Sequence, residues 1–212
     1  MVFKLILIGG GGHCHACIDV IESTRKFEII GVIDTIDKLG QLVLDYSVIG
    51  TDEDLPKLIN KDTWFLITLG HIKSSALRRK IFEKLESLKA NIATIISENA
   101  LVSKYSSIAK GTIIMHRVTI GPGSHIGQNC IINTNANIEH DTIVGNDVHV
   151  STHVVVNGNC ELKNGVFIGS NTTIFHGISI ENDTVIGAGS LVTKNIIEKG
   201  IYYGNPLSKK NG

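Results

Sequence analysis

The residue best suited to proton transfer in this chain is a histidine with an acid on each side. Six of the nine histidines fall in the second half of the 212-residue chain, and only His140 among them has acidic neighbours, Glu139 and Asp141. A carboxylate that accepts a hydrogen bond from one imidazole nitrogen fixes the tautomer and raises the basicity of the other nitrogen. We therefore predict that His140, assisted by Asp141, acts as a general base. The other histidines of this half are His116, His125, His149, His153 and His176.

Histidine and cysteine also alternate near the N-terminus, where residues 13–17 read His-Cys-His-Ala-Cys. Four potential ligands within five residues, on a turn and the first turn of a helix, cannot easily surround one tetrahedral metal ion. Cys130 and Cys160 fall on small inward positions of the repeat described next, where a thiol behaves as a small apolar residue. We expect no metal and, in a reducing cytoplasm, no disulfide.

The second half of the chain repeats with a period of six residues. Counting by sixes from Ile108 to Val192 gives fifteen consecutive positions that are all Ile, Leu or Val. The position two residues before each of them, from Ser106 to Ser190, is always small or β-branched. Neither an α-helix nor an isolated strand has this period, whereas a short strand plus a turn, repeated without insertion, does. The repeat therefore predicts a solenoid.

Three such segments close into a triangular coil of 18 residues, with one aliphatic side chain pointing into the prism at each corner. The small residue two positions earlier shares this inward face, because alternate strand residues point the same way. Fifteen corners make five coils, which are about 24 Å tall at roughly 4.8 Å per coil. Gly or Asn often follows a corner, and both tolerate the unusual backbone angles that we expect there. These residues are Gly121, Gly127, Asn133, Gly145, Asn157, Gly169 and Gly187.

Residues 1–98 follow a different rhythm, in which strand-like and helix-like segments alternate. Helical spacing of apolar residues follows the first strand candidate and recurs over Arg78–Leu88. Such alternation predicts a small parallel sheet with helices on its faces, a Rossmann-like α/β domain. We predict two domains, this α/β domain over 1–98 and an all-β solenoid with a short tail over 99–212. The strand candidates of the first domain are Lys4–Ile8, Glu28–Ile33, Trp64–Leu69 and Asn91–Ile96.

The first strand candidate runs into Gly9–Gly12 and then into a helix. A strand, a glycine-rich turn and a helix offer backbone N–H groups and a positive helix end to a phosphate. Asp34 ends the second strand candidate, where dinucleotide-binding folds place a ribose-binding acid. The fingerprint for NAD is incomplete, because Cys14 stands where it requires a third glycine. We predict that the loop binds a phosphate or a nucleotide, and the alternative is a tight turn without a ligand.

Composition excludes two classes of partner. The chain has 20 basic and 20 acidic side chains and no basic block, so binding to nucleic acid has no electrostatic support. No run of 18 apolar residues is present, which argues against a membrane span. Val2–Ile8 is too short for the core of a signal peptide and reads as a strand. We therefore expect a cytoplasmic protein.

The sequence resembles the hexapeptide-repeat acyltransferases, whose repeats form a left-handed parallel β-helix, over roughly residues 100–207. The stretch 5–13, Leu-Ile-Leu-Ile-Gly-Gly-Gly-Gly-His, with Ile-Asp-Val-Ile at 18–21, is similar to the opening of one acetyltransferase branch. That branch contains bacterial nucleotide 4-amino-sugar N-acetyltransferases and sialic-acid O-acetyltransferases. The resemblance implies that the N-terminal domain binds the nucleotide-sugar acceptor. The residues that match its acceptor contacts are Gly11, Gly12, His13, Asp34, Thr35 and Gly70.

The resemblance also implies roles for residues of the solenoid. Segment 133–140 matches the motif that carries the catalytic histidine, with Asp141 in place of the family's glutamate. Contacts to acetyl-CoA fall on His149, Ser170 and Ala188, and segment 203–206 resembles a C-terminal Gly-x-Pro turn near the pantetheine arm. Asp34-Thr35 replaces the two adjacent acids of some members. Enzymes of this fold are typically homotrimers with active sites between subunits.

We expect an acetyltransferase that moves the acetyl group of acetyl-CoA to the amine of a nucleotide-activated amino-deoxy sugar. In this hypothesis the amine attacks the thioester directly, and His140 removes its proton. The first alternative is O-acetylation of a sialic-acid-like sugar by the same base. A second alternative is a scaffold or metal-binding protein without transferase activity. These motifs do not specify whether the nucleoside is uridine, guanosine or cytidine.

Overall fold

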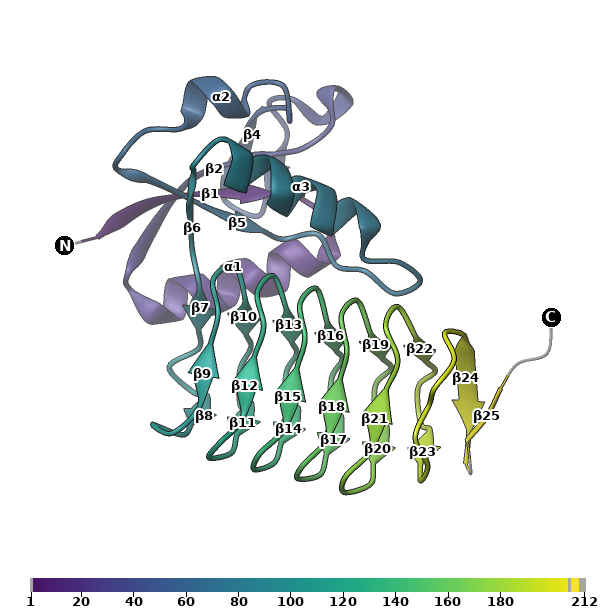
Figure 1. Cartoon of the computed structure of the whole chain (residues 1–212). Coiled ribbons are helices and arrows are strands. Elements are labelled where there is room, and N and C mark those ends of the chain that lie inside the picture. The colour runs from purple at the N-terminus through teal and green to yellow at the C-terminus, as the bar shows by residue number, and fades with distance from the viewer. Residues whose placement is uncertain (1, 206, 210–212) are drawn as a thin grey trace.

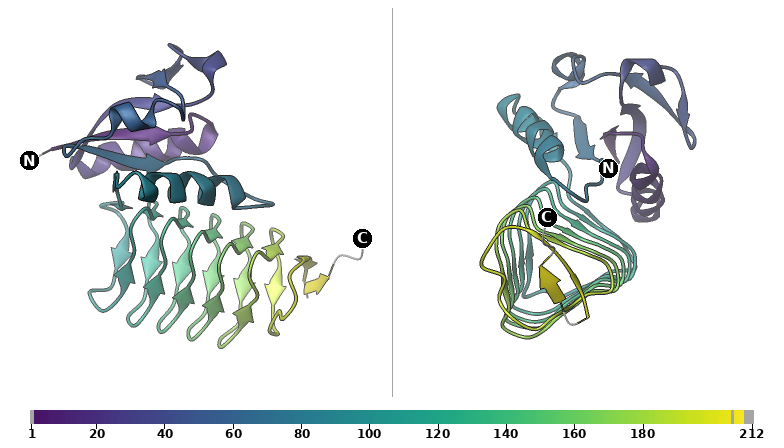
Figure 2. Two further views of the ribbon diagram at one scale, coloured as in Figure 1. Left: turned by 45° about the horizontal axis from the view of Figure 1, so that its top comes forward. Right: turned by 90° about the vertical axis from the view of Figure 1, so that its right-hand side faces the viewer.

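A triangular prism of short strands carries an α/β unit along one of its faces (Figures 1 and 2). The computed structural model describes residues 2–205 and 207–209. The fold prediction is confirmed, with an α/β unit followed by a hexapeptide-repeat left-handed β-helix. Pro206 of the expected C-terminal turn lies outside the described residues.

The N-terminal unit is a six-stranded sheet in the order β3-β4-β2-β1-β5-β6. Its strands are parallel apart from β3, which pairs with β4 as a hairpin within the stretch that separates the second and third strand candidates. The strands are β1 (Phe3–Ile8), β2 (Phe27–Ile33), β3 (Leu42–Val43), β4 (Tyr46–Gly50), β5 (Thr63–Ile67) and β6 (Asn91–Ile92). The helical segments are α1 (Gly12–Thr24), η1 (Ile36–Lys38), α2 (Leu55–Leu58) and α3 (Ala76–Ser87).

The prism has three parallel sheets, in which nearly every strand is only two residues long. The first sheet, which faces the N-terminal unit, contains β7 (Ile95–Ile96), β10 (Ile113–Ile114), β13 (Ile131–Ile132), β16 (His149–Val150), β19 (Phe167–Ile168), β22 (Val185–Ile186), β24 (Ile201–Gly204) and the antiparallel β25 (Leu207–Lys209). The second contains β8 (Leu101–Val102), β11 (Thr119–Ile120), β14 (Asn137–Ile138), β17 (Val155–Val156), β20 (Thr173–Ile174) and β23 (Leu191–Val192). The third contains β9 (Ser107–Ile108), β12 (His125–Ile126), β15 (Ile143–Val144), β18 (Glu161–Leu162) and β21 (Ser179–Ile180).

The strand candidate Asn91–Ile96 is two strands that belong to different sheets. β6 pairs with β5 in the N-terminal sheet, whereas β7 pairs with β10 of the prism. The first strand of the prism therefore lies just before the boundary that we expected after residue 98.

The interior of the prism is formed by the period-six residues. From Ile114 to Val192 every corner residue is at most 2% exposed, and the small residues two positions earlier are buried as well. Burial of an aliphatic side chain contributes roughly 1.5–3 kcal/mol, so the repeat supplies the core that two-residue strands could not form alone.

We predicted that the residues directly after the corners are often glycine because the backbone angles there are unusual. This prediction is wrong. Positive φ values fall three residues after the corners instead, as at Asp147 and Gly165. A Cβ on Gly121 would stand 2.7 Å from the backbone nitrogen of His140, and one on Gly145 would stand 2.6 Å from Oδ1 of Asn164. The glycines are therefore required by the close approach of the next coil.

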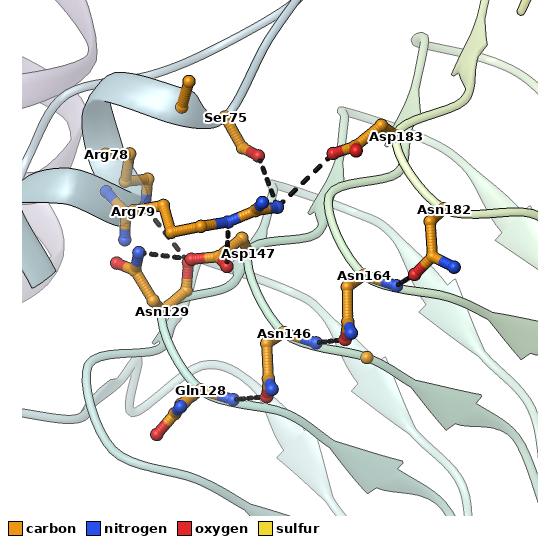
Figure 3. Close-up of polar contacts among 12 residues, drawn as sticks. Ser75, Arg78, Arg79, Gln128, Asn129, Asn146, Asp147, Asn164, Asn182 and Asp183 are labelled. Atoms are coloured by element: carbon orange, nitrogen blue, oxygen red, sulfur yellow. Dashed lines mark hydrogen bonds and ion pairs between the residues drawn. The ribbon is translucent and has the colours of Figure 1, made fainter. Parts of the chain in front are cut away.

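Arg78 of α3 joins the two units from a buried position (Figure 3). Its guanidinium donates to the carbonyl oxygens of Ile67 and Leu69, at 2.6 and 3.0 Å, and to that of Asn129 in the prism at 3.0 Å. Burial lowers its pKa to about 10, so the group stays charged at neutral pH. Carbonyl dipoles rather than a carboxylate hold this charge in the described structure.

The neighbouring Arg79 bridges two coils of the prism (Figure 3). Its Nε lies 2.9 Å from Asp147, and its Nη2 lies 3.3 Å from Asp183. Residues 18 positions apart stack on one another in a column along the prism, and Gly165 lies between the two aspartates in theirs. A Cβ on Gly165 would stand 2.9 Å from Nη2 of Arg79. A ladder of amides from Asn146, Asn164 and Asn182 runs beside this bridge, each Oδ1 accepting a backbone N–H of the preceding coil. Arg78 and Arg79 thus join the two units at one corner of the prism, with a cavity of about 370 Å³ beside it.

No helix among the described residues is both long and apolar enough to cross a bilayer.

Candidate active site

His140 lies at the corner between the second and third sheets, directly after β14. Its Nδ1 is 2.9 Å from Oδ2 of Asp141, and both side chains are at least half exposed. A carboxylate can only accept, so Nδ1 donates and Nε2 of the neutral ring is free of a proton. Glu139 does not share this contact, because its carboxylate accepts a hydrogen bond from Asn137 at 2.7 Å. The geometry is that of an imidazole ready to take up a proton.

The coil after His140 leaves room for its ring. Gly158 follows His140 in the same column, and a Cβ there would stand 2.5 Å from Nε2. His176 is the next member of the column, and the centroids of the two imidazole rings are 6.2 Å apart. Two coils separate their backbones by roughly 10 Å. The rings therefore lean together above Gly158, which a count of coils does not reveal.

His149 occupies a contrasting environment on β16, beneath the N-terminal unit. It is 7% exposed, and its Nδ1 donates to the carbonyl oxygen of His71 at 2.8 Å. Nε2 is therefore an acceptor, and Nδ2 of Asn133 lies 3.4 Å from it. Burial lowers the pKa of His149 to about 4, so the ring is neutral at pH 7.

Three histidines, His13, His71 and His149, lie together where the N-terminal unit packs on the first sheet, a region that we call the junction. The ring of His149 lies 5.3 Å from that of His71 and 6.2 Å from that of His13, between centroids. Burial, with smaller contributions from Arg78 and the neighbouring imidazoles, lowers the pKa of His13 and of His71 to about 3. The structure thus brings the predicted acceptor residue His13 to the predicted acetyl-CoA contact His149. Sequence reasoning missed His71, whose only signal was its position directly after Gly70 at the end of a strand.

The glycine loop is open where a ligand would approach. Neither Gly11 nor Gly12 has an atom within 4 Å of the position that a Cβ would occupy, and both are exposed at the start of α1. Gly70 lies beside His13, since a Cβ on it would meet that of His13 at 3.4 Å. Exposed N–H groups at a helix N-terminus favour an anion.

Asp34 is turned toward the protein instead of being free. Its Oδ2 accepts the N–H of Gly10 at 2.7 Å, its Oδ1 accepts that of Thr35 at 2.7 Å, and Nζ of Lys38 is 3.0 Å from both oxygens. Burial alone would raise its pKa, but the two N–H groups and the lysine hold the pKa below its ordinary value. Asp34 therefore fixes the glycine loop.

A cavity of about 640 Å³ opens beside Asp34 and Thr35, at the carboxyl ends of β1 and β2. Its walls are mostly aliphatic, and its rim is polar. Ligands of open α/β sheets bind at this end of the strands. The other lining residues are Ile8, Gly9, Ile33, Ile36, Thr51, Asp52, Glu53, Leu69, Leu77 and Ile81.

Ser170 and Ala188 occupy successive coils at the corner between the first and second sheets. The hydroxyl of Ser170 is 2.9 Å from those of Ser151 and Thr152. His140 follows β14 of the second sheet and precedes β15 of the third, so it lies at the corner opposite the first sheet. The N-terminal unit packs along one side of the triangular prism (Figure 2). A single chain therefore gathers His13, His149 and the glycine loop, but leaves His140 on the far side.

The two cysteines near the N-terminus, Cys14 and Cys17, are buried in the α/β unit. Burial raises the pKa of Cys17, and its Sγ lies 3.4 Å from the ring of His13. Among the described residues, no group of three or more His, Cys, Asp or Glu side chains is arranged to hold a metal ion.

Three family profiles match the chain and together follow its architecture. The PglD N-terminal domain matches residues 4–85. The GlmU-like C-terminal hexapeptide matches residues 89–153, and the hexapeptide repeat of succinyl-transferase matches residues 163–194. No curated protein matches the chain in sequence.

Several solved structures are similar over nearly the whole length of both chains. PerB from Caulobacter crescentus, in complex with CoA and GDP-perosamine, is 26% identical with a TM-score of 0.91, and the match covers 100% of this chain and 99% of that chain. The acetyltransferase domain of PglB from Neisseria gonorrhoeae, in complex with acetyl coenzyme A, is 24% identical with a TM-score of 0.93 and covers 99% and 100%. WeeI from Acinetobacter baumannii is 19% identical with a TM-score of 0.81 and covers 98% and 99%. At these identities the last two show the fold alone.

Proposed function

We propose that this chain, which belongs to the hexapeptide-repeat family of nucleotide amino-sugar N-acetyltransferases, transfers an acetyl group from acetyl-CoA to the amine of a nucleotide-activated amino sugar. The observation that carries the reaction is the half-exposed imidazole of His140, whose Nδ1 is tied to Asp141 and whose Nε2 is free to accept a proton. The relative PerB, crystallised with CoA and GDP-perosamine, supports both substrate classes.

The nucleotide of the acceptor binds at the N-terminal unit in this proposal. The exposed N–H groups of Gly11 and Gly12 at the start of α1 receive the phosphates. The aliphatic cavity beside Asp34 and Thr35 receives the nucleoside, and Gly70 with His13 borders the path toward the prism. The buried charge of Arg78, which no carboxylate bonds in the described structure, adds positive potential beneath this loop.

Acetyl-CoA binds along the prism, with His149, Ser170 and Ala188 among its contacts. His149 offers its unprotonated Nε2, so the partner that fits it is an N–H donor such as an amide of the pantetheine arm. The ring cannot serve as a strong base, because burial and the nearby guanidinium oppose a positive charge there.

The acetyl transfer is a direct displacement. The neutral amine attacks the thioester carbonyl, and a C–N bond forms as the amine proton passes to Nε2 of His140. Collapse of the tetrahedral intermediate breaks the C–S bond and leaves CoA as a thiolate, which takes up a proton. Asp141 stabilises the imidazolium that forms on His140, as carboxylates do in other acyl-transfer sites.

A homotrimer completes the site. In one chain His140 lies opposite the face that carries the acceptor loop, so His140 must act on an acceptor held by another copy. Closed cyclic assemblies bring two different surfaces of neighbouring copies together. A monomer of full activity, measured by light scattering alongside the assay, would contradict this arrangement.

Thiol release from acetyl-CoA tests the function. The acceptors are UDP- and GDP-linked 4-amino sugars, CMP-sialic acid and free sialic acid, given to the wild type and to His140→Ala. We expect release only with an amino sugar, reduced at least about 100-fold in the variant. Release only with a sialic acid would establish the O-acetyltransferase alternative, and full activity of the variant would exclude His140 as the base.

A further inference from the structure

His176 is the histidine whose ring lies beside that of the proposed base. The two imidazole centroids are 6.2 Å apart, at an angle of 43° between the ring planes, and both side chains are exposed. Gly158 separates them in the column and contributes no side chain. A methyl group on it would stand 2.5 Å from Nε2 and 2.6 Å from Cε1 of His140. The space beside Nε2 is thus bounded on its far side by the ring of His176.

This geometry sets the position of the reacting atoms. Nδ1 of His140 is engaged with Asp141, so the amine must deliver its proton to Nε2. Hydrogen-bond reach is about 3 Å between heavy atoms, so the amine and the thioester carbon bonded to it lie close to Nε2. Rings whose centroids are 6.2 Å apart leave no room for these atoms between them, so the reacting atoms approach from the open side of the pair and lie alongside both rings. The sulfur is one bond from that carbon and lies within reach of His176.

We propose that His176 is a second catalytic residue, the general acid that protonates the departing CoA thiolate. The proposal rests on the acetyl transfer described above. His140 accepts one proton from the amine as the C–N bond forms, and the protonated ring of His176 donates one proton to sulfur as the C–S bond breaks. A proton that then passes from His140 to His176, directly or through one water, returns both rings to their starting states without any further reactant.

Other polar groups at this corner are less suited to the role. Asp141 is bound to His140, and Glu139 is bound to Asn137 at 2.7 Å. Lys194 follows His176 in the column, one coil farther from His140. Cys160 is buried, with its Sγ 3.0 Å from the carbonyl oxygen of Phe175.

The test compares two acyl donors that differ in one atom. His176→Gln is assayed with acetyl-CoA and with its selenium analogue, acetyl-seleno-CoA, whose selenolate leaves readily without a proton. We expect kcat with acetyl-CoA to fall roughly 10- to 100-fold, the lower range for general acid catalysis, with KM for both substrates nearly unchanged. The selenoester should restore most of the loss. His125→Gln, at an exposed histidine of β12 that is hydrogen-bonded to Ser107, is the matched control and should behave as the wild type.

Two results would overturn the proposal. An unchanged kcat in His176→Gln would make His176 a surface histidine, and an equal loss with both donors would make its role structural. Failure of the underlying function gives a different result, because the wild type would then release no thiol with any amino sugar.

Discussion

His140 and His149 are nine residues apart in one solenoid, yet they lie in opposite surroundings. His140 stands at a bare corner with a carboxylate on Nδ1, and half of its side chain is exposed. His149 lies under the N-terminal unit with a carbonyl oxygen on Nδ1, beside two other histidines and the buried Arg78. Both hydrogen bonds fix the same tautomer, but the charged carboxylate of Asp141 stabilises a positive ring more strongly than the carbonyl of His71, whose effect on His149 is outweighed by burial.

The comparison assigns separate tasks to the two regions. Burial keeps the imidazoles of the junction neutral, so in the proposed function they recognise a ligand as neutral donors and acceptors. At the corner a carboxylate faces the imidazole of His140, so in the proposed function this region carries the proton transfer. Because the regions lie on opposite sides of one chain, the proposed function requires that they meet between copies.

The largest expected effect concerns the stability of the junction toward acid. The pKa values of His13, His71 and His149 lie at about 3 to 4 in the folded chain, against 6.5 for the unfolded chain. As the pH falls below 6.5, the histidines bind protons in the unfolded state but remain unprotonated in the folded state. Stability is therefore lost as the pH falls through 6.5 toward 3, by about 2 kcal/mol per histidine between pH 7 and pH 5.

Urea unfolding at pH 7 and pH 5 measures this loss. His71→Phe should make the pH dependence less steep, because one of the three groups is gone, whereas His125→Phe at an exposed site should leave the slope unchanged. Equal slopes for both variants would show that the junction histidines titrate freely.

The second effect separates the two histidines by kinetics. His140→Gln should lower kcat at least about 100-fold, equivalent to roughly 2.7 kcal/mol of transition-state free energy, with no change in Tm. His149→Gln should act mainly on KM for acetyl-CoA. Steady-state kinetics of both variants test this prediction. A larger loss of kcat in His149→Gln than in His140→Gln would make His149 the base.

A smaller effect is expected at Gly158. Ala at this position places a methyl group 2.5 Å from Nε2 of His140 and forces the ring to turn. We expect a decrease in kcat of about tenfold, or roughly 1.4 kcal/mol, without loss of CoA binding. Asn182→Ala, at a column of another corner, serves as the control, and an unaltered rate in Gly158→Ala would mean that the ring has another productive position.

The smallest effect lies at the bridge between the units. Arg79→Met removes the ion pairs with Asp147 and Asp183. The nearly buried carboxylate of Asp147 keeps its hydrogen bond from Asn129 but loses this cation. The guanidinium is more than one-third exposed, so we expect a loss of only about 1 kcal/mol in the free energy of unfolding. Lys163→Met, which breaks a surface pair with Glu181, should cost less, and urea titration of both variants checks the order.

The sequence predicts the prism well because its period depends only on local rules. Every coil repeats the same inward residues, so the fold, the strand positions and the exposed site of His140 follow from counting. The glycines after the corners were misread, because their cause lies in the next coil rather than in their own backbone.

The junction could not be predicted in the same way. His71, Arg78 and His149 are 7 to 78 positions apart in the chain, and only the packing of the N-terminal unit on the first sheet brings them together. Asp34 was expected to face a ribose, a role that stays a prediction, whereas in the structure it holds the glycine loop. Periodicity carries no information about such contacts.

Mixing two inactive variants tests most directly whether the two regions meet between copies. His140→Gln removes the base, and Gly12→Trp blocks the acceptor loop at a residue with open space around it. If each site combines the corner of one copy with the loop of another, co-expressed chains should regain about a quarter of the wild-type rate, since half of the corners and half of the loops are intact. A rate no higher than that of either variant alone would contradict the account.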